Sequence, residues 1–271
     1  MTEDVRFAQL PANARRGALT IEYQWIDAAD PDAPIVLFLH EGLGSIAMWR
    51  DWPRQLCDRL GMRGLVYSRP GYGRSTPRAH DEKWPVDFMS HQACDVLPAL
   101  LDALGIGDEA RARMWLVGHS DGGSIALLYA AAFPTRLRAA VVIAPHVFVE
   151  DISVQSIAEA KLAYEQTDLR KKLGRYHADV DSAFHGWNDI WLDPAFRAWN
   201  IVDRLGTIER PLFAVQAMDD HYGTMAQIEA IEAALPGTQL CKLPQGGHSP
   251  HRDAAQALND AVAAFVNRVR G

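Results

Sequence analysis

A serine set between closely spaced glycines is the most informative chemical feature of this chain. Gly118-His119-Ser120-Asp121-Gly122 follows a short apolar run, MWLV at 114–117, and precedes a helical pattern at 124–133. Glycines two residues before and two after a serine suit a sharp strand-to-helix turn that exposes the hydroxyl. The pattern predicts Ser120 as a nucleophile. The competing interpretation is a serine that only caps the helix, with glycines needed only for packing.

A serine hydroxyl becomes a good nucleophile only when a base takes its proton. His248 follows two glycines in the loop between the last apolar run, 240–243, and the final helical pattern. We therefore expect His248 to be the general base. His251 is the nearest competing histidine, but it belongs to the first turn of the expected helix and should point elsewhere.

A carboxylate is expected beside the base, because it fixes the imidazole tautomer and stabilises the imidazolium. Asp219 and Asp220 both lie just past the apolar run 212–217, at the carboxyl end of an expected strand, where sites form in parallel sheets. Either could serve, and the other would be a turn or capping residue. No metal site is expected at 219–221, because adjacent side chains of an extended chain point in different directions.

The negative charge that develops on an attacked carbonyl oxygen needs two hydrogen-bond donors. The backbone N–H of Asp121 is one candidate. The other is the N–H of Gly42, or less favourably Leu43, in the loop 40–45 that follows the apolar run 35–40. Glycines after a strand can also hold a phosphate, but this loop lacks the third glycine and the Lys-Ser/Thr pair of nucleotide sites. We therefore predict no nucleotide cofactor.

The carboxylates of Glu41 and Asp121 both flank the expected nucleophile. A carboxylate facing the substrate would favour a cationic or amine-bearing compound. Asp121 could instead form a salt bridge with Arg69 or Arg74. The sequence leaves both possibilities open.

Short apolar runs alternate with helical patterns along most of the chain, which predicts an α/β fold with a doubly wound, mostly parallel sheet. Pro98 should kink or split the longest helical pattern. The expected strands cover 19–25, 35–40, 64–68, 114–117, 139–144, 212–217 and 240–243, and the expected helices cover 48–60, 86–104, 124–133, 224–235 and 253–269.

The segment 146–210 has no strand pattern and is rich in helical, aromatic and charged residues. We expect it to form a helical cap over one edge of the sheet. The predicted core then consists of residues 1–145 and 211–271. Trp187 and Trp191 of the cap, with Glu41 and Tyr222, are the expected substrate contacts, although helical spacing of aromatics more often indicates core packing.

Composition narrows the class of protein further. The 271 residues are 48% hydrophobic and 23% charged, as in ordinary globular chains, and the net charge of -7 gives no reason to bind nucleic acid or an anionic membrane. No apolar run is long enough for a membrane helix, and the start MTEDVRFAQL lacks the apolar region of a secretory signal.

Three dispersed cysteines, Cys57, Cys94 and Cys241, indicate small buried hydrophobes rather than disulfides. The expected location is the cytoplasm.

Taken together, these motifs resemble the α/β-hydrolase fold superfamily, in particular its cap-bearing members with a Ser-Asp-His triad. The resemblance implies Asp220 as the acid, because AMDD at 217–220 matches the Gly-x-x-Asp segment of that family. Glu41 and Ala217 depart from it, since glycine is common at both positions. The matching segments are HEGLGS at 40–45, YSRPGYGRS at 67–75, GHSDGG at 118–123, AMDD at 217–220 and GGHSPH at 246–251.

The resemblance implies a serine hydrolase that acts on a small carboxylic ester or a related acyl compound through an acyl-enzyme, without metal or organic cofactor. Ser120 argues against the branches with an aspartate nucleophile, the haloalkane dehalogenases and epoxide hydrolases. The partner is a small-molecule substrate, and a homodimer is left open.

Two alternatives remain. A C–C bond hydrolase of aromatic degradation would use the same residues and bind a dicarboxylate through cap cations, for which Arg170, Lys171, Lys172 and Arg175 are available. A protein of the same fold that binds a ligand without turnover is an alternative of another class.

Overall fold

A computed structural model describes residues 4–270. Its centre is an eight-stranded sheet in the order β1-β2-β4-β3-β5-β6-β7-β8. Strands β3 to β8 are parallel, whereas β2 pairs antiparallel with both β1 and β4. The strands are β1 (Val5–Leu10), β2 (Leu19–Ile26), β3 (Ile35–Leu39), β4 (Arg63–Tyr67), β5 (Trp115–His119), β6 (Ala139–Ile143), β7 (Leu212–Ala217) and β8 (Gln239–Leu243). The predicted fold class is confirmed.

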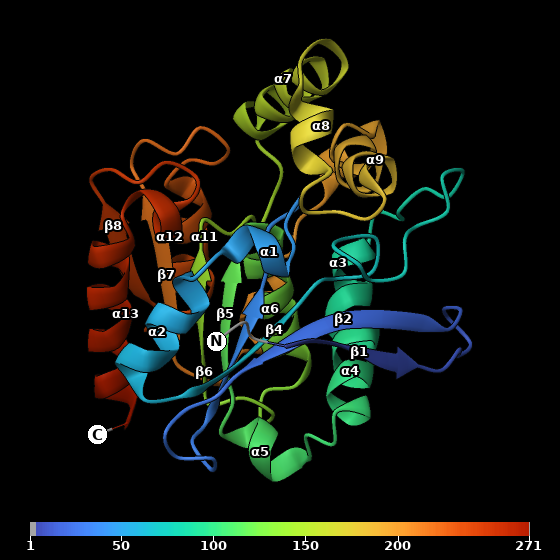
Figure 1. Ribbon diagram of the computed structural model, residues 1–271. Helices are drawn as coiled ribbons and strands as arrows, with labels where there is room; N and C mark the ends of the chain where they lie inside the picture. The colour runs from blue at the N-terminus through green and yellow to red at the C-terminus, as the bar shows by residue number, and fades with distance from the viewer. Residues whose placement is uncertain (1–3, 271) are drawn as a thin grey trace.

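The central strands are continuous apolar runs because helices cover both faces of the sheet (Figure 1). Every residue of β3, β5, β6 and β7 is buried. Strand β1 was not predicted, because it is an edge strand in which three residues in a row, 5–7, lack burial and no apolar run forms. The helices that flank the sheet are α1 (Ile46–Trp49), α2 (Trp52–Leu60), α3 (Phe88–His91), α4 (Leu97–Ala103), α5 (Asp108–Ala112), α6 (Asp121–Ala132), α11 (Ala226–Ala234), α12 (Pro250–Asp253) and α13 (Ala255–Arg270).

Local backbone geometry interrupts the longer helical patterns. The pattern 86–104 splits around η1 (Gln92–Val96), a π-helical turn in which the N–H of Leu97 bonds to the carbonyl of Gln92. Pro98 lacks an N–H for the regular ladder at this point, and the interruption takes the form of this π-helical turn, because α3, η1 and α4 follow one another without a gap. The prediction of a single helix over 48–60 is wrong. Arg50 has φ 55° and separates α1 from α2.

The helices between β6 and β7 form a separate layer, which we call the helical insert (residues 146–210). Figure 1 shows α7, α8 and α9 at the end of the molecule toward which β5 and β7 point. The carboxyl ends of the parallel strands lie beneath it, where sites in such sheets are found. The insert comprises α7 (Asp151–Gln166), α8 (Leu169–Leu173), α9 (Val180–Trp191), η2 (Pro194–Ala198) and α10 (Val202–Leu205).

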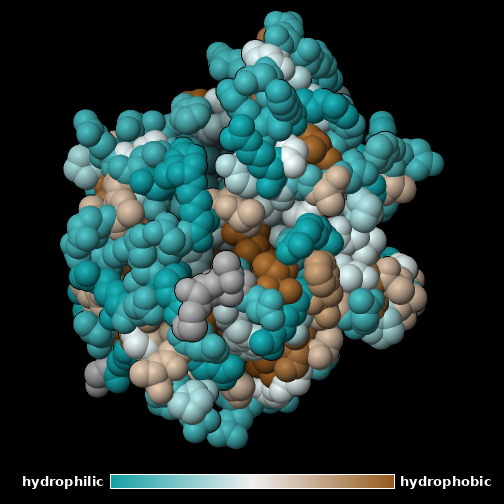
Figure 2. All heavy atoms as spheres, viewed as in Figure 1, coloured by the Kyte–Doolittle hydropathy of each residue, from teal (hydrophilic) through white to brown (hydrophobic). Residues whose placement is uncertain are grey.

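In Figure 2 most of the face shown is hydrophilic, and the largest hydrophobic cluster visible on it lies below the insert. None of the helices within residues 4–270 combines the length and apolar character needed to cross a membrane. Within residues 4–270 none of the three cysteines forms a disulfide. Cys57 is buried as expected, whereas Cys94 and Cys241 are only partly buried.

Candidate active site

Ser120 lies on the sharp turn between β5 and α6. Its backbone has φ 53° and ψ −121°, a strained conformation for a residue with a side chain. The turn also brings backbones into close approach, since a Cβ at Gly122 would lie 2.0 Å from the Leu39 carbonyl oxygen and one at Gly118 only 2.2 Å from the Gly122 oxygen. The glycine spacing therefore follows from the geometry that raises the serine hydroxyl.

His248 and Asp220 meet this serine from the far end of the chain. His248 Nε2 lies 2.9 Å from Ser120 Oγ, and His248 Nδ1 lies 2.9 Å and 3.0 Å from the two oxygens of Asp220. A carboxylate facing Nδ1 accepts its N–H, which leaves the lone pair of Nε2 free to accept the serine proton. The loops after β7 and β8 supply the two residues because parallel strands end at the same edge of the sheet.

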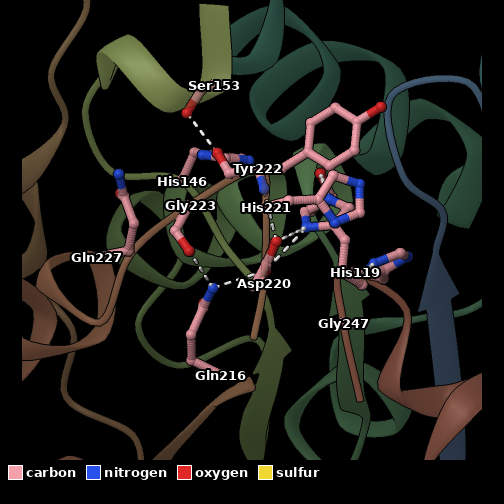
Figure 3. Close-up of polar contacts among 12 residues, drawn as sticks. His119, His146, Ser153, Gln216, Asp220, His221, Tyr222, Gly223, Gln227 and Gly247 are labelled. Atoms are coloured by element: carbon pink, nitrogen blue, oxygen red, sulfur yellow. Dashed lines mark hydrogen bonds and ion pairs between the residues drawn. The ribbon is translucent and has the colours of Figure 1, made fainter. Parts of the chain in front are cut away.

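The two neighbouring aspartates have different partners. Asp220 also accepts hydrogen bonds from the Tyr222 N–H at 2.8 Å and from Gln216 Nε2 at 2.7 Å, as Figure 3 shows. Asp219 faces the other way, and its Oδ1 accepts the N–H of Gly247 at 2.9 Å. The structure therefore places Asp220 against the imidazole and Asp219 against the loop that carries it.

The surroundings shift the pKa of both members of the pair. Burial alone would raise the pKa of Asp220, but the hydrogen bond and charge of His248 outweigh it and lower that pKa. Burial lowers the pKa of His248, and Asp220 opposes this only in part. The imidazole is therefore neutral, and the carboxylate ionised, near neutral pH.

The two predicted oxyanion donors each point away from a carbonyl that is hydrogen-bonded within the protein. The carbonyl of Glu41 accepts from Arg69 Nη2 and His40 Nδ1, both at 2.7 Å. Because the peptide is planar, the N–H of Gly42 points the opposite way. The carbonyl of Ser120 likewise bonds into α6, so the N–H of Asp121 points out of the start of that helix. Neither N–H donates to another residue in 4–270, which leaves both available to a ligand.

Arg69 joins the two backbone segments that carry these donors. Its side chain is fully buried, and Nη2 lies 2.7 Å from the Glu41 carbonyl and 3.7 Å from Asp121 Oδ2. Asp121 Oδ1 accepts from Trp191 Nε1 at 3.2 Å. Burial raises the pKa of Asp121 to about 6, although Arg69 and Trp191 oppose the shift. The sequence left open whether Asp121 faces a substrate or forms a salt bridge with Arg69 or Arg74. The structure shows the salt bridge with Arg69, whereas Arg74 pairs with Glu22.

A cavity of about 440 Å³ surrounds Ser120. All four predicted substrate contacts line it. Its wall toward the insert is mainly apolar. Trp187 packs so closely on Gly42 that a Cβ there would lie 2.2 Å from the indole. The apolar wall consists of Ile157, Ala160, Leu169, Leu173, Phe184, Trp187 and Trp191, and the polar groups include Glu41, His119, His146 and Tyr222.

Sequence reasoning did not place three further histidines, His119, His146 and His221, at this cavity. His119 Nε2 donates to the His248 carbonyl at 2.6 Å, and its Nδ1 lies 3.5 Å from Glu41 Oε2. Burial alone would raise the pKa of Glu41, but His119 and the histidines around it hold that pKa well below its usual range. His146 lies in the loop just after β6, which ends at Ile143, so the rule that sites form at strand carboxyl ends could have found it. Within residues 4–270, no group of acidic, histidine or cysteine side chains is arranged to hold a metal ion.

The sequence model of the alpha/beta hydrolase family matches residues 36–261. That span covers most of the chain and both halves of the sheet, and the chain belongs to this family.

Individual relatives are hydrolases with different substrates. The chain is 30% identical over 269 residues to the bifunctional esterase/perhydrolase DCH of Acinetobacter calcoaceticus, covering 87% of this chain and 92% of that one. It is 24% identical over 267 residues to 2-hydroxy-6-oxo-6-phenylhexa-2,4-dienoate hydrolase of Burkholderia cepacia, covering 89% of each. The proline iminopeptidase of Mycobacterium smegmatis shares the fold, with a TM-score of 0.75 at 18% identity over 98% of both chains.

Proposed function

We propose that this protein is a serine hydrolase that cleaves a small, uncharged carboxylic ester or related acyl compound through an acyl-enzyme. The 2.9 Å contact between Ser120 Oγ and His248 Nε2, continued by Asp220, carries this proposal. The strained turn and the two outward-facing N–H groups support it. Each is a part that acyl transfer requires.

In the proposed reaction, His248 takes the proton of Ser120 while the serine oxygen attacks the substrate carbonyl. The N–H groups of Gly42 and Asp121 stabilise the negative oxygen of the tetrahedral intermediate. His248 then gives its proton to the leaving group, and the acyl group remains on Ser120. Water, activated by His248, releases the acid and restores the serine. Asp220 holds the imidazole in the required tautomer throughout.

The cavity supports the choice of substrate. An apolar wall around one nucleophile favours an uncharged acyl or alcohol group. Asp121 and Glu41 both line the cavity, but Asp121 lies 3.7 Å from Arg69 and Glu41 lies 3.5 Å from His119, so each carboxylate already has a partner within the protein. The esterase among the relatives acts within the same reaction class. In this proposal the helical insert acts as a cap on a core formed by residues 1–145 and 211–271.

A C–C bond hydrolase is the second candidate, favoured by the relative of Burkholderia cepacia. The cations expected to hold its dicarboxylate substrate do not support it. Arg170 pairs with Asp181 and Lys172 with Asp168, all of them partly exposed, and none of these residues lines the cavity. We therefore rank ester hydrolysis first.

The test combines turnover with covalent labelling. The purified protein should hydrolyse p-nitrophenyl esters of short and medium chain length and react with a fluorophosphonate at Ser120. Ser120→Ala should lose both activities to background. Substantial hydrolysis by Ser120→Ala would refute the nucleophile, whereas an unreactive wild type would favour a binding protein without turnover.

A further inference from the structure

The backbone of His146 is held rigidly beside the nucleophile. Its N–H donates to Ser124 Oγ at 3.2 Å, and Ser124 Oγ donates to its carbonyl at 2.6 Å. Ser124 lies one helical turn after Ser120 on α6. The next N–H, of Val147, donates to Gln227 Oε1 at 2.7 Å. The position of His146 relative to Ser120 is therefore set by the core rather than by a mobile loop.

The side chain of His146 has no comparable partner. Only 3% of the residue is exposed, and its ring packs edge-on against Trp191 with 4.9 Å between ring centroids. Neither ring nitrogen makes a hydrogen bond to any residue in 4–270, and Nδ1 is completely buried. A buried polar atom without a partner is costly, so an unpaired ring at this position calls for an explanation. Because Nδ1 has no exposed surface, Nε2 is the ring nitrogen that can reach a molecule in the cavity.

The ring nevertheless lines the cavity around Ser120. Its centroid lies 5.9 Å from that of His248. Burial, reinforced by the charge of His248, lowers the pKa of His146 to about 3. The imidazole is therefore neutral at physiological pH and offers one N–H donor and one lone-pair acceptor.

We infer that His146 is a substrate-binding residue that forms a hydrogen bond with a hydroxyl, carbonyl or amide group near the scissile bond. This inference rests on the proposed function and narrows its substrate class from apolar esters to acyl compounds with one such polar group. The apolar wall of the insert would accommodate the rest of the molecule. A role as a second general base does not fit, because the ring bonds to neither Ser120 nor His248.

The test uses pairs of substrates that differ only in a hydroxyl and a methyl group. On the acyl side these are p-nitrophenyl 3-hydroxypropanoate and p-nitrophenyl butanoate, and on the alcohol side 2-hydroxyethyl and propyl butanoate. In His146→Phe, kcat/KM for the hydroxyl member of one pair should fall by about 3- to 10-fold relative to its methyl partner, the loss expected for one neutral hydrogen bond. His146→Asn, which retains hydrogen-bonding groups, should recover part of that ratio.

An unchanged hydroxyl-to-methyl ratio in both pairs would overturn the inference, and an equal loss for both members would show that the ring only packs. Calorimetry of the same esters with Ser120→Ala, with and without His146→Phe, gives the hydroxyl-to-methyl ratio of binding constants independently of turnover. If the wild type neither hydrolyses esters nor reacts with a fluorophosphonate, the proposed function fails. The binding ratio then still decides the role of His146.

Discussion

Asp219 and Asp220 are chemically identical neighbours that the fold places in different surroundings. Asp220 is buried and is fixed by hydrogen bonds with His248, Gln216 and the backbone N–H of Tyr222 in its own loop. Asp219 is exposed and accepts the N–H of Gly247, in the loop before His248. From residue types alone the two could not be separated. The contacts made by the loop after β8 separate them.

Substitution of the two aspartates should therefore have unequal effects. Asp220→Asn should lower kcat/KM for a p-nitrophenyl ester by about 10³- to 10⁴-fold, because an amide facing Nδ1 favours the wrong imidazole tautomer. Asp219→Asn, the matched control, should cost no more than about 10-fold through loosening of one loop hydrogen bond. Equal losses in the two variants would contradict the assignment of Asp220.

The pH dependence of the reaction should reflect His248. Only the neutral imidazole can accept the serine proton, so activity is lost as pH falls through its pKa. Burial lowers that pKa below the ordinary value of 6.5, and Asp220 raises it in part. We expect kcat/KM to rise with pH through a midpoint below 6.5 and then to level off. Asp220→Asn should move the midpoint of its residual activity to lower pH. A wild-type midpoint above 6.5 would argue against this environment.

At the level of elements, close approach of strands and loops decides where glycine is required. Gly122 starts α6 directly against the end of β3, and Gly42 lies under the indole of Trp187. The glycine spacing around Ser120 predicts the contact of Gly122 with β3, because that spacing is typical of this turn. The second contact joins the insert to the loop after β3, and no local pattern in the sequence indicates it.

Gly122→Ala should be strongly destabilising. The added methyl group would lie 2.0 Å from the Leu39 carbonyl, a backbone atom that cannot move aside cheaply. We expect the free energy of unfolding to fall by about 3 kcal/mol or more, measured by urea denaturation. Gly17→Ala is the control, since nothing lies within 4 Å of its Cβ position, and it should change stability by less than about 1 kcal/mol. Comparable losses for both would show that the turn can open.

For the whole molecule, the helical insert and the loops at the ends of the sheet together enclose the cavity around Ser120. The reactive groups come from loops of the core, whereas α7, α8 and α9 supply the apolar wall of the cavity. The net charge of -7 is distributed over the chain and gives no direction to substrate recognition. Substrate length should therefore depend on side chains of the insert that do not touch Ser120.

Filling this space from α7 should shorten the preferred substrate. In Ala160→Phe, the new ring would occupy part of the 440 Å³ cavity. We expect p-nitrophenyl octanoate to lose at least about 10-fold in kcat/KM while the acetate changes by less than about 3-fold, since overpacking strains only the longer acyl chain. Leu162→Phe, on the exposed face of the same helix, should leave both rates unchanged. A uniform fall for both esters would indicate that the cavity does not bind the acyl chain.

The sequence by itself determined the alternating strands and helices, the sharp turn at Ser120 and the position of a long helical insert. These features depend on neighbours in the chain: apolar runs form buried strands, glycine spacing permits the turn, and Pro98 interrupts the regular hydrogen-bond ladder of a helix. The edge strand β1 escaped prediction because its pattern is weak. The family resemblance implied Asp220, and the structure shows that Asp220 rather than Asp219 contacts His248. Only the tertiary structure decided that Arg69 joins the two segments with the predicted oxyanion donors and that His146 lines the cavity. Each of these depends on side chains far apart in the sequence, which only the packing of loops at the ends of parallel strands brings together.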